Sequence, residues 1–153
     1  MKYKGKVVII TGAGRPAPLQ DGTAGSIGYG IATAFAKEGA DLVITGRNMQ
    51  KLLDAKRELE QLYGIRVLAL QADVNAGADN EATVQYVIDE TVKTFGRIDV
   101  LINNAQASAS GVSIADHTTE QFDLAMYSGL YSTADCASGF SPGVGNLSAT
   151  MPT

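Results

Sequence analysis

The sequence of 153 residues has no tryptophan, one cysteine and one histidine, and these scarcities exclude several kinds of site. The single Cys136 cannot form a disulfide within the chain, and together with the single His117 it cannot build a Cys/His metal cluster. The longest aliphatic run, Val7 to Ile10, is far shorter than the roughly 20 apolar residues of a membrane span. We therefore expect a cytoplasmic protein without a metal centre, a transmembrane helix or a secretory leader.

Basic residues are absent from the last third of the chain. All 12 Lys and Arg lie within residues 1–97, whereas residues 98–153 carry acids and no base. The net charge of −4 argues against nucleic-acid binding through a basic surface. Chemistry that requires a lysine must draw it from the part of the chain before Phe95.

Short apolar runs alternate with amphipathic stretches along the first 131 residues. The apolar runs predict buried parallel strands at 6–11, 41–45, 66–71 and 98–103. Apolar residues at helical spacing predict helices at 26–38, at 48–63, from 79 or 80 to 95, and from 118 onward. This alternation predicts an α/β fold, a Rossmann-like doubly wound parallel sheet in which the predicted strands lie in the order 3-2-1-4. Without a fifth strand, the sheet is expected to be truncated after the fourth strand and the helix that follows it, which leaves the fourth strand at an open edge.

From Ser132 the sequence consists mostly of small residues and follows neither a helical nor a strand period. We therefore predict an incomplete dinucleotide-binding domain at residues 1–131 and an irregular C-terminal tail at residues 132–153. The tail is interpreted either as a natural flexible end or as the product of a truncation or a frameshift.

The turn after the first predicted strand is rich in glycine, with Gly12, Gly14, Gly25, Gly28 and Gly30 between the strand and the body of a helix. Glycines at this place let backbone amides approach a pyrophosphate, toward which the following helix directs its positive N-terminus. The context predicts a dinucleotide-binding turn.

This turn resembles the T-G-x-x-x-G-x-G motif of the short-chain dehydrogenase/reductase family, which here begins at Thr11-Gly12 and ends at Ile27-Gly28. Ser26 stands where the middle glycine is usual, and the stretch Arg15–Ala24 looks inserted. The segment SIGYGIA, residues 26–32, is also similar to the glycine turn of enoyl-acyl-carrier-protein reductases, a divergent branch of the same family.

Three further segments resemble the motifs of the family in the same order and extend the resemblance over about residues 4–131. Ala72-Asp73-Val74 is similar to the Asp-Val that contacts the adenine, and Phe122-Asp123 to the start of the fifth helix. Asn103-Asn104-Ala105-Gln106 is similar to the N-N-A-G motif, with Gln106 in the place of the glycine. The resemblance implies a cofactor site formed by Gly12, Gly14, Ser26, Ile27, Gly28, Arg47, Asp73, Val74, Asn103 and Ala105.

The end of the second predicted strand bears on the choice of cofactor. NAD-binding proteins commonly place an acid there for the ribose 2′-hydroxyl, whereas an arginine accommodates the 2′-phosphate of NADP. Here the sequence is Gly46-Arg47-Asn48, without an acid, and Arg15 is expected to add a second positive charge. We therefore expect NADP as the cofactor, with NAD less favoured.

The resemblance also implies hydride transfer in which a tyrosine acts as acid or base and a lysine four positions later lowers its pKa. The last lysine is Lys93, and Tyr127 and Tyr131 are followed four positions later by Tyr131 and Asp135, so no such pair follows the fourth predicted strand. Gly129 stands where the helix of the family carries an asparagine that supports a proton relay.

Neither His117 nor Cys136 has the neighbours that would make it a base or a nucleophile, so we assign no catalytic residue. Three functions remain open. The first is the NADP-binding portion of a short-chain oxidoreductase that acts on a carbonyl or alcohol substrate and is inactive as this chain. The second is a non-catalytic nucleotide-binding or interaction module, and the third is an enoyl-reductase-like enzyme. The expected partners are a nicotinamide dinucleotide, a small-molecule substrate and a second copy of the chain at the open sheet edge.

Overall fold

The computed structural model describes residues 1–16, 26–73, 80–107 and 111–140, which form a parallel sheet flanked by helices. In chain order its elements are β1 (Val7–Thr11), α1 (Ile27–Lys37), β2 (Asp41–Gly46), α2 (Met49–Tyr63), β3 (Val67–Gln71), α3 (Asn80–Phe95), β4 (Val100–Ile102), η2 (Ile114–Asp116), α4 (Thr119–Met126), η3 (Tyr127–Tyr131) and α5 (Ser132–Phe140).

The strands lie in the order β3-β2-β1-β4 and every neighbouring pair is parallel, which confirms the predicted topology. Ile9 at the centre of β1 is in register with Val43 of β2 on one side and with Leu101 of β4 on the other. Among the described strands, β4 pairs with β1 alone, so its other edge is open.

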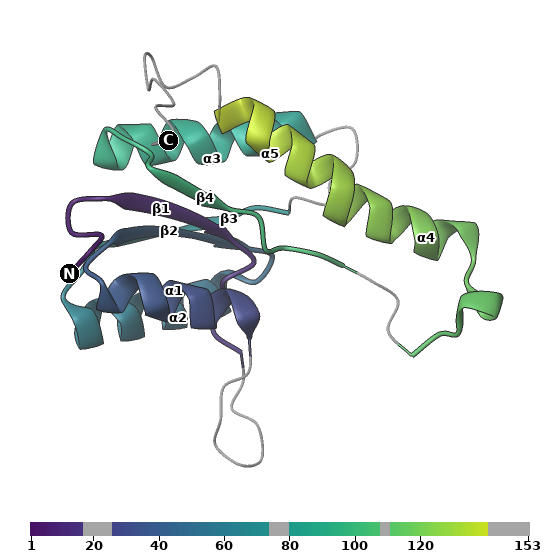
Figure 1. Cartoon of the computed structure of the whole chain (residues 1–153), viewed down its shortest axis with the longest axis horizontal. Helices are drawn as coiled ribbons and strands as arrows, with labels where there is room; N and C mark the ends of the chain where they lie inside the picture. The colour runs from purple at the N-terminus through teal and green to yellow at the C-terminus, as the bar shows by residue number, and fades with distance from the viewer. Residues whose placement is uncertain (17–25, 74–79, 108–110, 141–153) are drawn as a thin grey trace, which may run out of the picture.

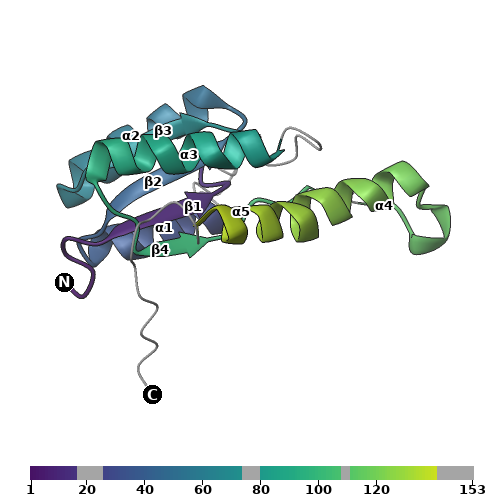
Figure 2. The ribbon, with the colours of Figure 1, turned by 90° about the horizontal axis from the view of Figure 1, so that it is seen from above.

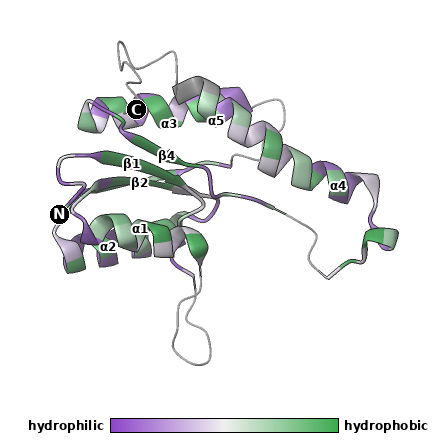
Figure 3. Ribbon diagram, viewed as in Figure 1, coloured by the Kyte–Doolittle hydropathy of each residue, from purple (hydrophilic) through white to green (hydrophobic). Residues whose placement is uncertain are grey.

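Helices cover both faces of the sheet, with α1 and α2 on one face and α3 and α5 on the other (Figure 1, Figure 2). Because successive strand residues point to opposite faces, Val8 and Ile10 of β1 pack into the core beneath α1 and α2, whereas Val7 and Ile9 pack into the core beneath α3. All four side chains are almost completely buried, and Figure 3 shows the hydrophobic residues concentrated in the strands. Their burial on both faces explains the unbroken apolar run in the sequence.

Local signals in the sequence define the ends of the helices. The side chain of Asn48 accepts a hydrogen bond from the backbone of Lys51 at the start of α2, and Gly64 ends that helix in the left-handed conformation. Thr118 and Gln121 form the predicted capping box at the start of α4.

The prediction of an irregular tail from Ser132 is wrong for the first nine residues of that segment, because Ser132–Phe140 is the helix α5. Contacts with α3 explain this helix. Cys136 is buried in the same core cluster as Val84 and Val87 of α3, and the side-chain amide of Asn80 donates a hydrogen bond to Asp135 at 2.7 Å. The sequence signal was weak because α5 presents small side chains to its neighbour. Residues 141–153 lie outside the described part of the chain.

The segments α4, η3 and α5 follow one another as a continuous helical rod that extends beyond the sheet at its α4 end (Figure 1, Figure 2). Its central segment η3 is a π-helical turn, in which the N–H of Ser132 bonds to the carbonyl of Tyr127. Within the described residues, we find no helix with the length and apolar character of a membrane span.

Candidate dinucleotide site

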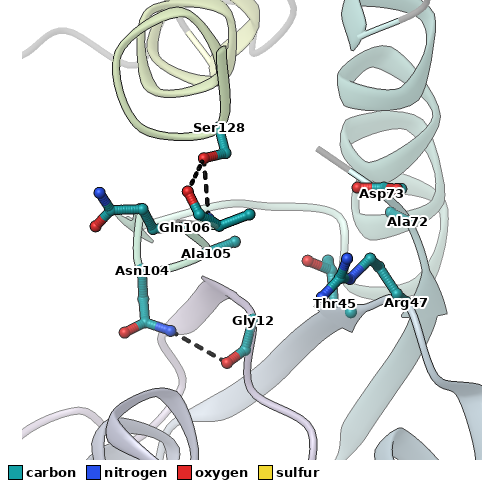
Figure 4. Close-up of a pocket in the computed structure, with 11 residues that line it drawn as sticks. Gly12, Thr45, Arg47, Ala72, Asp73, Asn104, Ala105, Gln106 and Ser128 are labelled. Atoms are coloured by element: carbon teal, nitrogen blue, oxygen red, sulfur yellow. Dashed lines mark hydrogen bonds between the residues drawn. The ribbon is translucent and has the colours of Figure 1, made fainter. Parts of the chain in front are cut away.

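A pocket of about 190 Å³ opens where the carboxyl ends of all four strands meet (Figure 4). The lining consists of residues at or just after the end of each strand, together with one residue of the helical rod: Gly12, Thr45, Gly46, Arg47, Ala72, Asp73, Asn104, Ala105, Gln106, Ala107 and Ser128. Ligands of open α/β sheets bind at this edge, at the point where the chain leaves neighbouring strands in opposite directions. Here that point lies between β1 and β4.

The turn after β1 is held against β2 and β4. The N–H groups of Gly12 and Ala13 both donate to the carbonyl of Thr45, at 2.9 and 3.0 Å. Gly12 has φ +70°, and a Cβ there would lie 3.0 Å from the Cα of Ala105. Both the left-handed backbone and the close approach therefore require glycine at this position.

Gly28 brings the first turn of α1 against the same loop. A Cβ on Gly28 would lie 2.1 Å from the carbonyl oxygen of Gly12 and 2.6 Å from Nδ2 of Asn104. Ser26 caps the helix by accepting a hydrogen bond from the backbone of Tyr29 at 3.4 Å, while Ile27 is 79% exposed. Of the predicted residues in this helix start, Gly28 has the strictest steric requirement.

Thr11 and Asn104 connect the ends of β1 and β4. Nδ2 of Asn104 donates to the carbonyls of Thr11 and Gly12, at 3.0 and 3.1 Å. The hydroxyl of Thr11 accepts from the N–H groups of Asn104 and Ala105, both at 3.0 Å. These bonds fix the floor of the pocket and satisfy partly buried backbone groups.

Of the remaining residues predicted for the cofactor site, some line the pocket and others do not. Ala105 lines the pocket, but Asn103 is exposed and is not among the described lining residues, where its neighbour Asn104 takes its place. Gly14 also lies outside the described lining and faces α2, where a Cβ would be 3.2 Å from that of Lys51. Val74, residues 17–24 of the proposed insertion and Gly25 lie outside the described residues.

Arg47 and Asp73 line the side of the pocket next to β2 and β3. The carbonyl of Arg47 accepts a hydrogen bond from Nε2 of Gln71 at 2.9 Å, which fixes its backbone. Its side chain is exposed and has no ion pair with the described residues. The hydroxyl of Thr45 is buried and has no hydrogen-bond partner among the described residues, so the exposed side chain of Arg47 is the cation that this side of the pocket offers to a ligand.

The expectation that Arg15 adds a second charge to this pocket is wrong for the described structure. Its guanidinium forms an ion pair with Glu58 of α2, and Arg15 is not among the described lining residues. Glu58 also accepts a hydrogen bond from the hydroxyl of Tyr29 at 2.6 Å. Burial of the ring and the carboxylate of Glu58 raise the pKa of Tyr29 to about 12, so the phenol stays protonated.

The sequence did not reveal the part played by Ser128 and Gln106. Ser128 of η3 is 1% exposed, and its Oγ accepts from the N–H of Ala107 and donates to the carbonyl of the same residue, both at 2.9 Å. The helical rod thereby holds the loop after β4 in place. Gln106 lies across the pocket from Arg47 and Asp73 (Figure 4).

Neither His117 nor Cys136, the base and the nucleophile considered from the sequence, is among the described residues that line this pocket. His117 is exposed, and its Nδ1 lies 3.0 Å from the carbonyl of Ser113. Burial raises the pKa of the Cys136 thiol to about 11, with a further contribution from the neighbouring Asp135 carboxylate. The described residues contain no cluster of His, Cys, Asp or Glu suited to a metal ion.

A parallel sheet with a glycine turn after its first strand and a pocket at its carboxyl edge defines the class of Rossmann-like α/β domains. Residues 22–150 match the family model described as Enoyl-(Acyl carrier protein) reductase. The chain thus belongs to the short-chain dehydrogenase/reductase family, within which this model falls.

Among its relatives, the chain is 58% identical over 131 residues to the 12alpha-hydroxysteroid dehydrogenase of a Clostridium species, a match that covers 86% of this chain and 48% of the relative. It is 38% identical over 135 residues to the NADP-dependent mannitol dehydrogenase of Alternaria alternata, covering 88% and 46% of the two chains. The chain spans about half the length of these curated relatives.

Among solved structures, the fold is similar to that of L-sorbose reductase from Gluconobacter frateurii, crystallised with NADPH and L-sorbose. The TM-score is 0.77 at 30% identity, and the match covers 94% of this chain and 49% of the reductase.

Proposed function

We propose that this chain binds a nicotinamide dinucleotide, NADP in preference to NAD, as the cofactor-binding portion of an oxidoreductase that acts on a carbonyl or alcohol substrate. The observation that carries the proposal is the pocket at the carboxyl ends of β1, β2 and β4, lined by both the glycine turn and Arg47. The NADPH complex of the similar reductase and the NADP dependence of the mannitol dehydrogenase support it.

The residues present fit such a ligand. The packing of Gly28 on Gly12 leaves no room for a Cβ between the turn and α1, so the backbone at the start of the helix is bare of side chains on that side. The N-terminus of a helix favours a pyrophosphate, because its first N–H groups are unpaired and its dipole is positive there. Gly12 and Ala105 then face the middle of the dinucleotide, and Asp73 and Arg47 face its adenosine end. The dinucleotide, when bound, supplies the hydride acceptor or donor of the reaction.

Arg47 is the residue that we expect to select NADP. A charge-assisted hydrogen bond to a phosphate contributes about 1.5–3 kcal/mol, or roughly ten- to a hundredfold in affinity. Calorimetry with the purified chain should therefore show tighter binding of adenosine 2′,5′-bisphosphate than of AMP, and the difference should shrink in high salt. Arg47→Ala should remove most of this difference. Arg57→Ala is the matched control, since its exposed side chain lies on α2 and is not among the described lining residues. Equal affinity for the two nucleotides, or no binding of either, would contradict the proposal.

We also infer that the 153-residue chain does not by itself catalyse hydride transfer. Its sequence has no lysine after Lys93, so neither Tyr127 nor Tyr131 is followed by the lysine of the family's catalytic Tyr-x-x-x-Lys pair. Both rings are half exposed and contact each other, with centroids 5.2 Å apart. An assay of the pure protein with NADPH and a ketone should show no turnover. Turnover that Arg47→Ala abolishes would show the inference to be wrong, whereas binding without turnover also fits a non-catalytic nucleotide-binding module.

Enoyl reduction is a second candidate reaction, supported by the description of the matching family model and by the segment at residues 26–32. The 58% identity to a hydroxysteroid dehydrogenase favours the interconversion of a carbonyl and an alcohol instead. Turnover of an enoyl thioester in the same assay, without turnover of the ketone, would reverse this order and would also contradict the inference that the chain is inactive by itself.

The open edge of β4 supports self-association, because an unpaired strand edge offers its backbone N–H and C=O groups to another chain. Analytical ultracentrifugation should detect a dimer or larger species, and a monomer at all concentrations would contradict this. The single cysteine, Cys136, supports placement in the reducing cytoplasm, which fractionation of the source cells would test.

A further inference from the structure

The side chain of Gln106 packs against Gly129 of the helical rod. A Cβ on Gly129 would lie 3.6 Å from Nε2 of Gln106 and 3.9 Å from its Cδ and Cγ. These are ordinary van der Waals distances, so the carboxamide of Gln106 lies directly over the bare backbone of Gly129. Gln106 lines the pocket, and Gly129, 23 positions later in the sequence, lies behind its side chain and directly after the lining residue Ser128.

Two neighbouring contacts hold Gln106 at this place. The backbone on its C-terminal side is tied to the rod by Ser128, whose Oγ bonds both the N–H and the carbonyl of Ala107. The backbone on its N-terminal side is tied to β1, because the N–H of Ala105 donates to Thr11. The carboxamide itself makes no hydrogen bond with the described residues, so its two N–H donors and its oxygen are available to a ligand.

The carboxamide of Gln106 can occupy this position because Gly129 has no side chain. One carbon atom there is tolerated, but any longer side chain that left the rod in the same direction would occupy the position of the Gln106 amide. Gln106 in its present position and a long side chain at position 129 are therefore mutually exclusive.

We propose that the carboxamide of Gln106 binds a hydroxyl of the second ribose of the dinucleotide, the one attached to nicotinamide, and that Gly129 is the residue that gives it room. The inference rests on the proposed function, which places the adenosine end at Arg47 and Asp73. Gln106 lies on the opposite side of the pocket, beyond the glycine turn (Figure 4), where the second nucleoside of an extended dinucleotide must lie. A carboxamide suits a ribose because each hydroxyl both donates and accepts a hydrogen bond.

The test compares two nucleotides on the same variants of the 153-residue chain by calorimetry. NADP⁺ carries both nucleosides, whereas adenosine 2′,5′-bisphosphate carries only the end assigned to Arg47. We expect Gln106→Ala to weaken binding of NADP⁺ about three- to tenfold, the effect of one or two lost hydrogen bonds, and to leave the bisphosphate unchanged. Gly129→Leu should cause the same selective loss by displacing the amide. Gln85→Ala, which removes an exposed carboxamide on α3, is the matched control.

Three outcomes overturn the inference, and they are distinguishable. Unchanged NADP⁺ affinity in Gln106→Ala or in Gly129→Leu contradicts the role of the amide and leaves the proposed function intact. An equal loss for both nucleotides in Gln106→Ala indicates a structural effect on the whole pocket and contradicts it as well. If neither nucleotide binds the unmodified chain, the proposed function fails and the inference fails with it.

Discussion

Thr11 and Asn104 lie 93 residues apart in the sequence and are joined by two hydrogen bonds of 3.0 Å at the carboxyl edge of the sheet. In one, the hydroxyl of Thr11 accepts from the N–H of Asn104, and it also accepts from the N–H of Ala105. In the other, the side-chain amide of Asn104 donates to the carbonyl of Thr11, and it donates to that of Gly12 as well. The glycine turn and the loop after β4 are consequently one unit, and a change in either residue should alter the stability of both.

Replacing Asn104 by alanine should destabilise the fold. The variant leaves the partly buried carbonyls of Thr11 and Gly12 without their donor, which costs about 1–3 kcal/mol in the free energy of unfolding. Urea denaturation followed by circular dichroism measures this change. Asn103→Ala is the control, because that side chain is exposed, and its midpoint should stay close to that of the unmodified protein. Equal effects of the two substitutions would contradict the assignment of the structural role to Asn104.

Two glycines two positions apart in α1 should respond oppositely to alanine. At Gly28 a Cβ would lie 2.1 Å from a backbone oxygen, so Gly28→Ala should cost about 3 kcal/mol or more, or prevent folding. At Gly30 nothing lies within 4 Å of a Cβ, so Gly30→Ala should gain up to about 1 kcal/mol from helix propensity. Thermal unfolding of both variants tests the pair. A stable Gly28→Ala protein would mean that the turn and the helix are further apart than described.

Stability at alkaline pH should depend on Tyr29. Its pKa is raised from 10 in the unfolded chain to about 12 in the folded protein, chiefly by burial and then by Glu58. The folded state therefore holds the phenolic proton more tightly than the unfolded state does. This contribution to stability is fully present below pH 10 and is lost as the pH rises through about 12.

Tyr29→Phe should accordingly show a smaller loss of unfolding free energy than the unmodified chain between pH 10 and 12. Glu58→Gln removes the nearby negative charge and should lower the pKa of Tyr29, which a spectroscopic titration of tyrosinate detects. An identical pH profile for Tyr29→Phe and the unmodified chain would show that the phenol titrates alike in the folded and unfolded states.

Cys136 should report on the docking of α5 against α3. Its thiol is 7% exposed, and a pKa of about 11 lowers the thiolate fraction at neutral pH about a hundredfold below that of an ordinary thiol. Reaction with an aromatic disulfide should be slow in buffer and fast in urea, with the single cysteine as the sole reporter. Asn80→Ala removes the hydrogen bond to Asp135 and should accelerate the reaction in buffer. Equal rates in buffer and in urea would show that α5 does not pack as described.

The features that the sequence predicted well are those controlled by near neighbours in the chain. Asn48, Gly64 and the Thr118–Gln121 box mark helix ends because a cap bonds backbone groups only a few residues away. The strand order followed from the alternation of strands and helices, together with the position of the glycine turn, since parallel strands require crossover connections of one hand.

Pairs that are distant in the sequence were not predictable in this way. Nothing in the local sequence distinguishes Asn103 from Asn104, because the difference arises from which of the two faces β1. The ion pair of Arg15 with Glu58 depends on how the turn packs on α2. Because of this pair, the charge of Arg15 interacts with α2 and not with the cofactor pocket, for which the sequence had suggested it. Helix α5 likewise depends on contacts with α3, and a stretch of mostly small residues gives no apolar period from which those contacts could be predicted.

The π-helical turn at η3 determines how the faces of α4 are rotated, about the axis of the rod, relative to those of α5. Each residue of an α-helix turns the direction of its side chain by about 100°, and a π turn contains roughly one residue more than an α turn. The faces of α4 and α5 are therefore offset from each other around a common axis. Helix α5 is anchored through Cys136 and η3 through Ser128, so the offset decides which side of α4 is presented to the surroundings. Loss of one residue between Ser128 and α4 would therefore rotate α4 about the axis of the rod and move the exposed ring of Phe122 to another side, while the sheet stayed in place.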